Sequence, residues 1–345
     1  MNILKLRDSV MIVEESDSIY QAVFTSSRRI KRFGIDELGK ELIEYLKETR
    51  SEVEIFTHFS KYGPETIRTY IDSLRKLNLV SEQGKFVEPR HLRQVTFIGE
   101  LTYSTVETQD LQKRITDSKV AVFGVGGIGG WIVNGLAQLG VQEIRISDTD
   151  IVEESNLNRQ LFFTSKDIGR YKVDVIKEKI PDSNIKTYKT RVAKDISLDE
   201  IIDGANFIIN CADSPSVAET SRIIDSYARP RKIAYSIAGG YNMHLGMVGP
   251  IIIPGVSACF DCFLEHQKSN DPLKNMKMIK DVEQTGNLGA MAGAIANLHV
   301  MDFFKFKTGK GTPNINKFAE INFMDLSIEW RNFASRPDCP TCGKV

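Results

Sequence analysis

The sequence has neither a net charge nor a long hydrophobic run. Among its 345 residues, Lys and Arg together number 45, as do Asp and Glu, so there is no overall positive field for nucleic acid or an anionic membrane. The most apolar stretch, 246–256, is interrupted by Gly and Pro and is too short to span a bilayer. Residues 1–18 lack the apolar segment of a signal peptide. We therefore expect a cytoplasmic protein that binds neither nucleic acid nor a membrane.

Cysteine is also scarce, and four of the five cysteines form two Cys-x-x-Cys pairs, Cys259/Cys262 and Cys339/Cys342. In a reducing compartment such pairs are more often metal ligands than disulfides. Four thiolates are a common tetrahedral set for Zn²⁺ and leave no position open for catalysis. We expect a structural zinc site that clamps the C-terminal tail onto the preceding domain, with a redox pair as the alternative. Cys211, at the end of an apolar run, is expected to be a small buried residue.

The first part of the chain, residues 1–88, differs in pattern from the rest. It combines short β-rich runs (9–14, 19–25 and 28–34) with three helical segments that begin at Asp36, 51 and Pro64 and a final pair of β-runs around a glycine turn at 79–88. This order is typical of a winged-helix module. Most winged helices bind DNA, but acidic and basic residues balance here too, whereas phosphate binding needs a cationic face.

From residue 119 onward, strands and helices alternate. We expect strands at 119–124, 142–148, 185–190, 206–211 and 232–237, and helices at 127–139, 168–180, 215–228 and from Gly289 to about 306. Alternation of this kind predicts an α/β domain over 89–345 with a Rossmann-like, mostly parallel sheet. The polar segment 263–288 is predicted to be a mobile loop or lid.

A glycine-rich run directly follows the first of these strands and opens a helix. Its glycines, Gly124, Gly126, Gly127 and Gly129, allow a tight turn and a close approach to phosphates at the helix N-terminus. Asp148, with Asp150 close behind it, ends the next strand, where a carboxylate would accept a ribose hydroxyl. These features suit NAD and ATP equally well.

Polar residues after Asp150 separate the two nucleotides. Asn156, Arg159 and Gln160 form the pattern N-x-x-R-Q, and Lys172 follows at a short interval. Two cations behind the ribose site suit a polyphosphate whose charge must be neutralised while a bond breaks, a need that hydride transfer does not have. The sequence therefore predicts an ATP site.

Together these motifs, with the strand-end Cys-Ala-Asp213, resemble the adenylation domain shared by ThiF, MoeB and ubiquitin-activating enzymes, over about residues 90–345. The resemblance implies that Asp213 helps to hold Mg²⁺ and that Arg159 and Lys172 contact the phosphates. It also implies the zinc site and a homodimer, in which Arg93 reaches the ATP of the partner subunit. In such chemistry a carboxylate attacks the α-phosphate of ATP, and an acyl-adenylate and pyrophosphate form.

The two halves in this order resemble enzymes that modify ribosomally made precursor peptides in microcin C and pantocin biosynthesis. This implies that residues 1–88 capture a precursor peptide, which could add as a strand to an exposed sheet edge. Tyr241 and Asn242 are further candidates for peptide contacts. Since 263–288 contains no cysteine, a thioester relay is disfavoured. The product would be a nucleotide-linked peptide or, as we prefer, a peptide dehydrated by ring closure.

Three alternatives stay open. The enzyme could be a MoeB/ThiF-like adenylyltransferase that acts on the C-terminus of a sulfur-carrier protein. The chain could instead be a nucleotide-sensing DNA-binding protein without turnover. The N-terminal module could also serve only dimerisation or packing.

Overall fold

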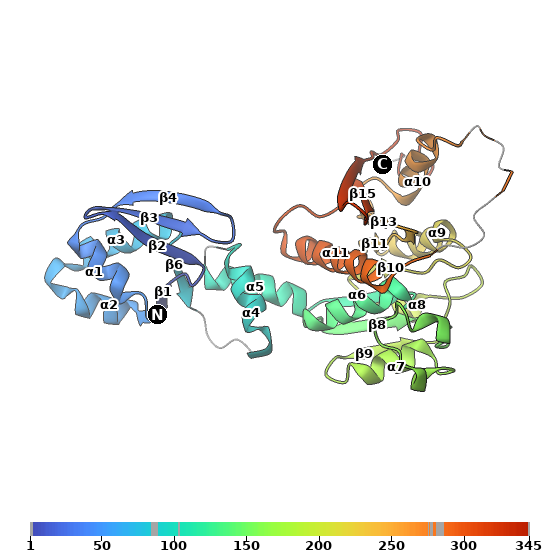
Figure 1. The fold of residues 1–345 in the computed structure, drawn as a ribbon, viewed down its shortest axis with the longest axis horizontal. Helices are drawn as coiled ribbons and strands as arrows, with labels where there is room; N and C mark the ends of the chain where they lie inside the picture. The colour runs from blue at the N-terminus through green and yellow to red at the C-terminus, as the bar shows by residue number, and fades with distance from the viewer. Residues whose placement is uncertain are drawn as a thin grey trace. The chain divides into compact units, whose positions relative to one another are not determined.

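The computed structural model describes residues 3–83, 89–102, 104–274, 276, 279–280 and 286–343. The chain divides into two compact units, Met1–Lys113 and Arg114–Val345 (Figure 1). Each unit has its own hydrophobic core. No described helix has both the length and the apolar character that a membrane crossing requires.

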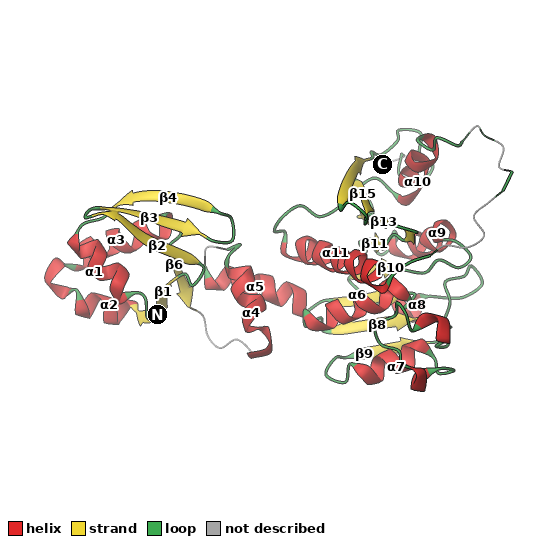
Figure 2. Cartoon of the chain, in the orientation of Figure 1, coloured by secondary structure: helices red, strands yellow, loops and turns green. Residues whose placement is uncertain are grey.

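The first unit contains two small antiparallel sheets and a set of helices (Figure 2). One sheet has the order β5-β1-β6 and the other β2-β3-β4. The strands are β1 (Ile3–Leu6), β2 (Val10–Ser16), β3 (Ile19–Phe24), β4 (Arg29–Gly34), β5 (Arg50–Ser51) and β6 (Val80–Gln83). The helices are α1 (Glu37–Tyr45), α2 (Glu52–His58), α3 (Pro64–Lys76), α4 (Leu92–Gly99) and α5 (Thr105–Thr116), which crosses the boundary between the units.

Local signals explain where the three predicted helices of this unit begin. The Asp36 carboxylate accepts a hydrogen bond from the Gly39 amide (3.0 Å), and Ser51 forms a capping box with Glu54. Pro64 occupies the first position of α3, where its missing N–H costs nothing. Apolar side chains of these helices, such as Leu42, Ile55 and Ile67, are buried together with Leu4 and Ala22 from the strands. The three β-runs and three helices predicted over 9–76 are confirmed, as is the first β-run of 79–88, which is β6; β1 was not predicted. The second β-run expected within 79–88 falls on residues 84–88, which lie outside the described residues, and it stays a prediction.

The second unit is built on a six-stranded sheet of order β14-β11-β10-β7-β8-β9. Five strands are parallel, and β14 (Ile251–Ile252) is antiparallel to its neighbour. The parallel strands are β7 (Lys119–Phe123), β8 (Glu143–Ser147), β9 (Ile185–Tyr188), β10 (Phe207–Asn210) and β11 (Tyr235–Ile237). The predicted α/β fold with a mostly parallel sheet is thus confirmed.

Helices cover both faces of this sheet, because alternate residues of each strand point to opposite sides. On β7, Val120 and Val122 pack in one core, with residues of α6 (Gly127–Gln138), α7 (Lys172–Lys179) and α11 (Gly289–Thr308). Ala121 and Phe123 pack in the other, with α8 (Asp199–Ile202), α9 (Val217–Ala228) and α10 (Phe260–Ser269). The strands that follow β7 in the chain, β8 and β9, lie on one side of it in the sheet, whereas β10 and β11 lie on the other side. A crevice is expected at such a reversal, outside the carboxyl ends of β7 and β10.

A second, four-stranded antiparallel sheet of order β12-β13-β15-β16 completes the unit. Its strands are β12 (Tyr241–Asn242), β13 (Leu245–Val248), β15 (Lys317–Asn322) and β16 (Ser327–Asn332). The predicted loop at 263–288 is wrong in its first part, where α10 continues to Ser269. The helix forms because Phe260, Cys262 and Phe263 bury one of its faces. Residues 275, 277–278 and 281–285 of that segment lie outside the described residues.

Candidate active site

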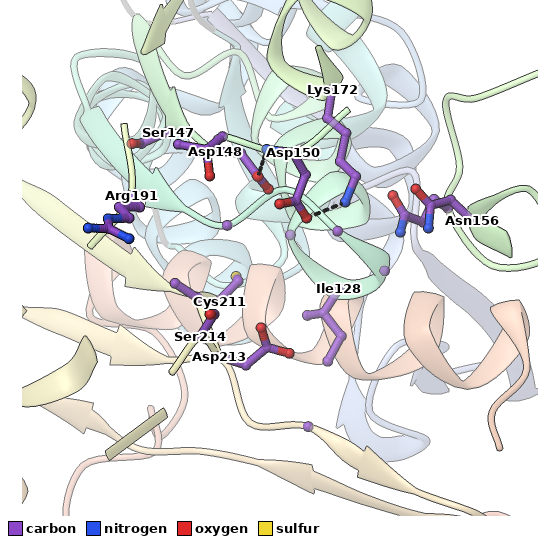
Figure 3. Close-up of a pocket in the computed structure, with 18 of the residues that line it drawn as sticks. Ile128, Ser147, Asp148, Asp150, Asn156, Lys172, Arg191, Cys211, Asp213 and Ser214 are labelled. Atoms are coloured by element: carbon purple, nitrogen blue, oxygen red, sulfur yellow. Dashed lines mark hydrogen bonds and ion pairs between the residues drawn. The ribbon is translucent and has the colours of Figure 1, made fainter. Parts of the chain in front are cut away.

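A cavity of about 940 Å³ opens at the expected crevice (Figure 3). Its walls come from the carboxyl ends of β7, β8 and β10 and from the starts of α6 and α7. Every residue predicted to bind the nucleotide lines it, namely Gly124, Gly126, Gly127, Gly129, Asp148, Asp150, Asn156, Arg159, Gln160 and Lys172, as does Asp213. The motifs that the sequence separates by nearly ninety positions therefore meet in one place.

The glycine loop is sterically required at two of its positions. Gly124 has a φ of +81°, and a Cβ there would lie 2.8 Å from the carbonyl carbon of Cys211. A Cβ on Gly129 would lie 2.0 Å from the carbonyl oxygen of Gly124. Gly126 is the N-cap residue of α6 and has no side chain that could accept hydrogen bonds from the first amides of the helix. The amides at the start of this helix are thus left to meet an anion, as the sequence predicts.

The carboxylate of Asp148 connects the glycine loop to the next strand. It accepts hydrogen bonds from the backbone amides of Val125 (2.8 Å) and Asp150 (2.8 Å). Burial raises the pKa of Asp148, although these amides and the charge of Lys172 act in the opposite direction. Asp148 therefore holds the loop in shape besides facing the cavity.

Lys172 is buried at the start of α7, and its ammonium group is directed toward the cavity. It donates to the Asp150 carboxylate at 2.7 Å, as Figure 3 shows. Only 7% of the Lys172 side chain is exposed, against 64% for Asp150. The pair thus keeps a desolvated cation in place beside a carboxylate that water can still reach.

The N-x-x-R-Q segment forms a tight turn at the cavity wall. Asn156 is buried, and its side-chain oxygen accepts the Glu153 amide at 3.1 Å, so this residue shapes the turn. Arg159 donates to the carbonyl of Ser155 and to the side chain of Asn158. Gln160 is buried, and its side-chain oxygen has no hydrogen-bond partner among the residues that the structure describes.

The structure adds lining residues that the motifs did not indicate, including Thr190, Arg191, Ser214 and Asn287. Thr190 and Arg191 follow β9, so the rule that ligands bind at the carboxyl ends of parallel strands would have pointed to them. Tyr241, expected to contact a peptide, also lines the cavity, where a Cβ on Gly127 would lie 2.6 Å from its hydroxyl. Burial raises the pKa of Tyr241 against the opposing effect of Arg159.

The remaining predicted residue, Arg93, is not among the residues that line the cavity. Arg93 lies in α4 of the first unit, and its contact with the ATP of a partner subunit stays a prediction.

Cys211 lines the cavity, but desolvation, followed by the charges of Asp213 and Asp148, raises the pKa of its thiol. A thiol that resists ionisation is a poor nucleophile.

The four paired cysteines come together away from this cavity. Their sulfur atoms all lie within 4.8 Å of one another, and the Cys259–Cys339 and Cys262–Cys342 Sγ pairs are each 3.5 Å apart. None forms a disulfide. Tetrahedral thiolate ligands about 2.3 Å from an ion would be separated by about 3.8 Å, so the cluster is the right size for a metal.

Comparison with known proteins agrees with this geometry. Residues 92–343 match the ThiF family, and the chain belongs to that family. It is therefore an ATP-dependent, carboxylate-activating enzyme. The SAMP-activating enzyme E1 of Haloferax volcanii is 25% identical over 237 residues, 68% of this chain and 83% of the relative. The ThiS adenylyltransferase of Escherichia coli K12 is 27% identical over 241 residues, 68% of this chain and 89% of the relative.

Solved structures extend the similarity in fold to almost the whole chain. E. coli MccB with ATP superposes with a TM-score of 0.73 at 20% identity, covering 99% of this chain and 100% of that one. PaaA superposes with a TM-score of 0.69 at 22% identity, covering 95% of this chain and all of PaaA. Both resemblances inferred from the motifs are thereby confirmed.

The contact between Gly129 and Gly124 yields a prediction. Gly129→Ala should lower the free energy of unfolding by about 1–3 kcal/mol, because the added methyl group would overlap a backbone carbonyl that cannot easily move. Denaturant unfolding would measure the loss. Gly126→Ala is the matched control, since its Cβ would meet nothing closer than Gln160 Nε2 at 3.9 Å. Equal stability of the two variants would contradict the assignment.

Proposed function

We propose that this enzyme uses ATP to activate a carboxylate on a ribosomally made precursor peptide, which the first unit binds. The observation that carries the proposal is the coverage of the fold. The two curated relatives above align with 68% of this chain and a UBA4 adenylyltransferase and sulfurtransferase of Lodderomyces elongisporus with 88%, whereas the folds of MccB and PaaA cover 99% and 95% of it. MccB has been crystallised with the peptide MccA, and one such structure describes it as a microcin C7 biosynthetic enzyme.

The cavity suits the first chemical step. A carboxylate is a poor acyl donor until an oxygen of it attacks the α-phosphate of ATP, which forms an acyl-adenylate and breaks the bond to the leaving pyrophosphate. The protein must bring two anions together and offset their repulsion. Arg159 and Lys172 supply positive charge, and the amides at the start of α6 supply hydrogen-bond donors. Asp213, exposed at the end of β10, offers the carboxylate oxygen that Mg²⁺ prefers, and Mg²⁺ would neutralise phosphate charge there.

The first unit has a groove suited to an extended peptide. The groove encloses about 620 Å³ between α1 and the strands β1 to β3, with Leu6, Val10, Ile12, Tyr20 and Ile43 among its lining residues. Lys40, Glu41, Glu44 and Lys47 contribute charges of both signs, which suits a peptide better than a phosphate backbone. Since β2 is an edge strand of its sheet, a peptide could pair with its main chain.

Other parts of the proposal concern assembly and product. The enzyme is proposed to act in the cytoplasm as a homodimer, with Arg93 directed to the partner's ATP. Leu92 and Phe97 are exposed on the same helix, as an apolar subunit contact requires. Of the two outcomes, nucleotide attachment and dehydrative ring closure, we favour ring closure.

A second candidate function is adenylation of a sulfur-carrier protein at its C-terminus. It is favoured by the 27% sequence identity between this chain and an enzyme named as a ThiS adenylyltransferase. It makes no use of the groove in the first unit.

The deciding experiment incubates the enzyme with ATP, Mg²⁺ and the precursor peptide encoded beside this gene. We expect pyrophosphate or phosphate release that depends on the peptide, and a peptide mass lower by one water or higher by a nucleotidyl group. A ThiS-type carrier protein is tested in parallel. Release that depends on the carrier and not on the peptide would overturn the proposal.

The phosphate contacts give a prediction of their own. Lys172→Ala and Arg159→Ala should each lower kcat/KM by at least about 100-fold, because each removes a charge placed where phosphate charge develops. Thermal unfolding should change little in Lys172→Ala, since the loss of the cation leaves only the solvated Asp150 carboxylate without its partner. It should change little in Arg159→Ala because the contacts of Arg159 with Ser155 and Asn158 are exposed. Lys166→Ala, at an exposed position in the same segment, is the control. Turnover at the wild-type rate in either variant would refute its contact with phosphate.

We further propose that the cysteine cluster holds a structural Zn²⁺. Elemental analysis should find about one zinc per chain, and Cys339→Ser should abolish it, because three thiolates retain the ion poorly. Cys211→Ser should keep the full zinc content, since Cys211 lies outside the cluster. A zinc content that does not change in Cys339→Ser would argue against the site.

A further inference from the structure

Two buried side-chain oxygens in the cavity wall lack a hydrogen-bond partner within the described residues. They are Gln160 Oε1, in the predicted nucleotide motif, and Asn287 Oδ1, which no motif indicated. A buried acceptor without a donor is costly, so native proteins seldom keep one without a use. Both oxygens belong to a ligand site, and a bound ligand would supply the missing donor.

Asn287 is held beside the segment that carries Arg159. On one side, the Gly286 amide contacts Met243 Sδ at 3.4 Å, next to the turn that follows Tyr241. On the other side, Gly289 approaches so closely that a Cβ there would lie 3.0 Å from the Asn158 carbonyl and 3.2 Å from Arg159 Cα. Asn287 therefore belongs to the part of the wall that Arg159 and Tyr241 form.

The chemistry of ATP limits what can satisfy Asn287 at this position. The triphosphate carries only acceptor oxygens, which would be repelled by another acceptor. The donors of ATP are its ribose hydroxyls and adenine amino group, at the end of the molecule that Asp148 is expected to hold. A peptide as second substrate carries backbone N–H groups, which are donors of the kind that the triphosphate lacks.

We infer that Asn287 accepts a hydrogen bond from a backbone N–H of the peptide substrate, close to the carboxylate that reacts. This inference rests on the proposed function, since it takes the second substrate to be a peptide. Asn287 would act as a positioning residue that brings the carboxylate to the α-phosphate. Asn287 would thereby contribute to choosing the substrate.

The test compares nucleotide binding with peptide use. Asn287→Ala should raise the KM for the precursor peptide encoded beside this gene about tenfold, the usual effect of losing one hydrogen bond. Its affinity for a non-hydrolysable ATP analogue, measured without peptide, should stay within twofold of wild type. Gln160→Ala should show the reverse pattern, because Gln160 belongs to the nucleotide motif. Asn297→Ala is the matched control, since Asn297 lies on α11 outside the cavity lining and donates to the Gly293 carbonyl.

Peptides with single amide-to-ester replacements near the reacting carboxylate identify the N–H. One replacement should raise the KM of the wild-type enzyme for the peptide about tenfold. The same replacement should not raise the KM of the Asn287→Ala variant further, because both changes remove the same hydrogen bond. The inference is overturned if no position shows this non-additivity, or if Asn287→Ala weakens the ATP analogue tenfold or more. If the wild-type enzyme turns over no peptide, the proposed function itself fails, and this inference falls with it.

Discussion

The carboxylate of Asp148 is the contact on which the rest of the site depends. It ties the glycine loop after β7 to the end of β8 by accepting hydrogen bonds from amides of both segments, and it does so in a half-buried position. Asp150 donates its amide to Asp148 and accepts a hydrogen bond from Lys172 with its carboxylate, so Asp148 also helps to position Lys172. One desolvated carboxylate therefore fixes the shape of the loop, the start of α6 and the direction of the buried cation. Such preorganisation lets a site act on charge without first rearranging.

In the second unit, the residues of the nucleotide motifs and the clustered cysteines lie at different places. The residues predicted to bind the nucleotide lie where the strand order reverses, and the four clustered cysteines, two of them at the start of α10, do not line that cavity. Cys211 stays in the cavity but is made unreactive by desolvation and by the neighbouring carboxylates. The Cys211 thiol is thus a poor nucleophile, and the predicted roles of the other lining residues are electrostatic and positional. This agrees with activation of a carboxylate by nucleotide alone.

Local rules predicted much of this protein, and their failures have physical causes. Strand and helix periodicity identified β7 to β11 with α6 and α9, because burial on both sheet faces leaves a strong pattern. The glycine loop, Asp148, Arg159 and Lys172, predicted to lie together because a phosphate site needs fixed residue types at short spacing, do line one cavity. The helix α10 was missed because its buried face is short and its other residues are polar. Asn287 could not be found, since a single amide becomes informative only when the burial of its oxygen and the lack of a partner among the described residues are known.

The cysteine cluster also has a consequence for the unfolded chain. The sulfur atoms that approach at 3.5 Å belong to residues 80 positions apart, so an ion there closes a large loop that contains α11, β15 and β16. A cross-link of this span reduces the conformational entropy of the unfolded state, and the effect grows with the logarithm of loop length. The same loop carries Asn287 and the start of α11. The metal would thus lower the entropic cost of bringing a wall of the cavity into place, although none of the four cysteines lines that cavity.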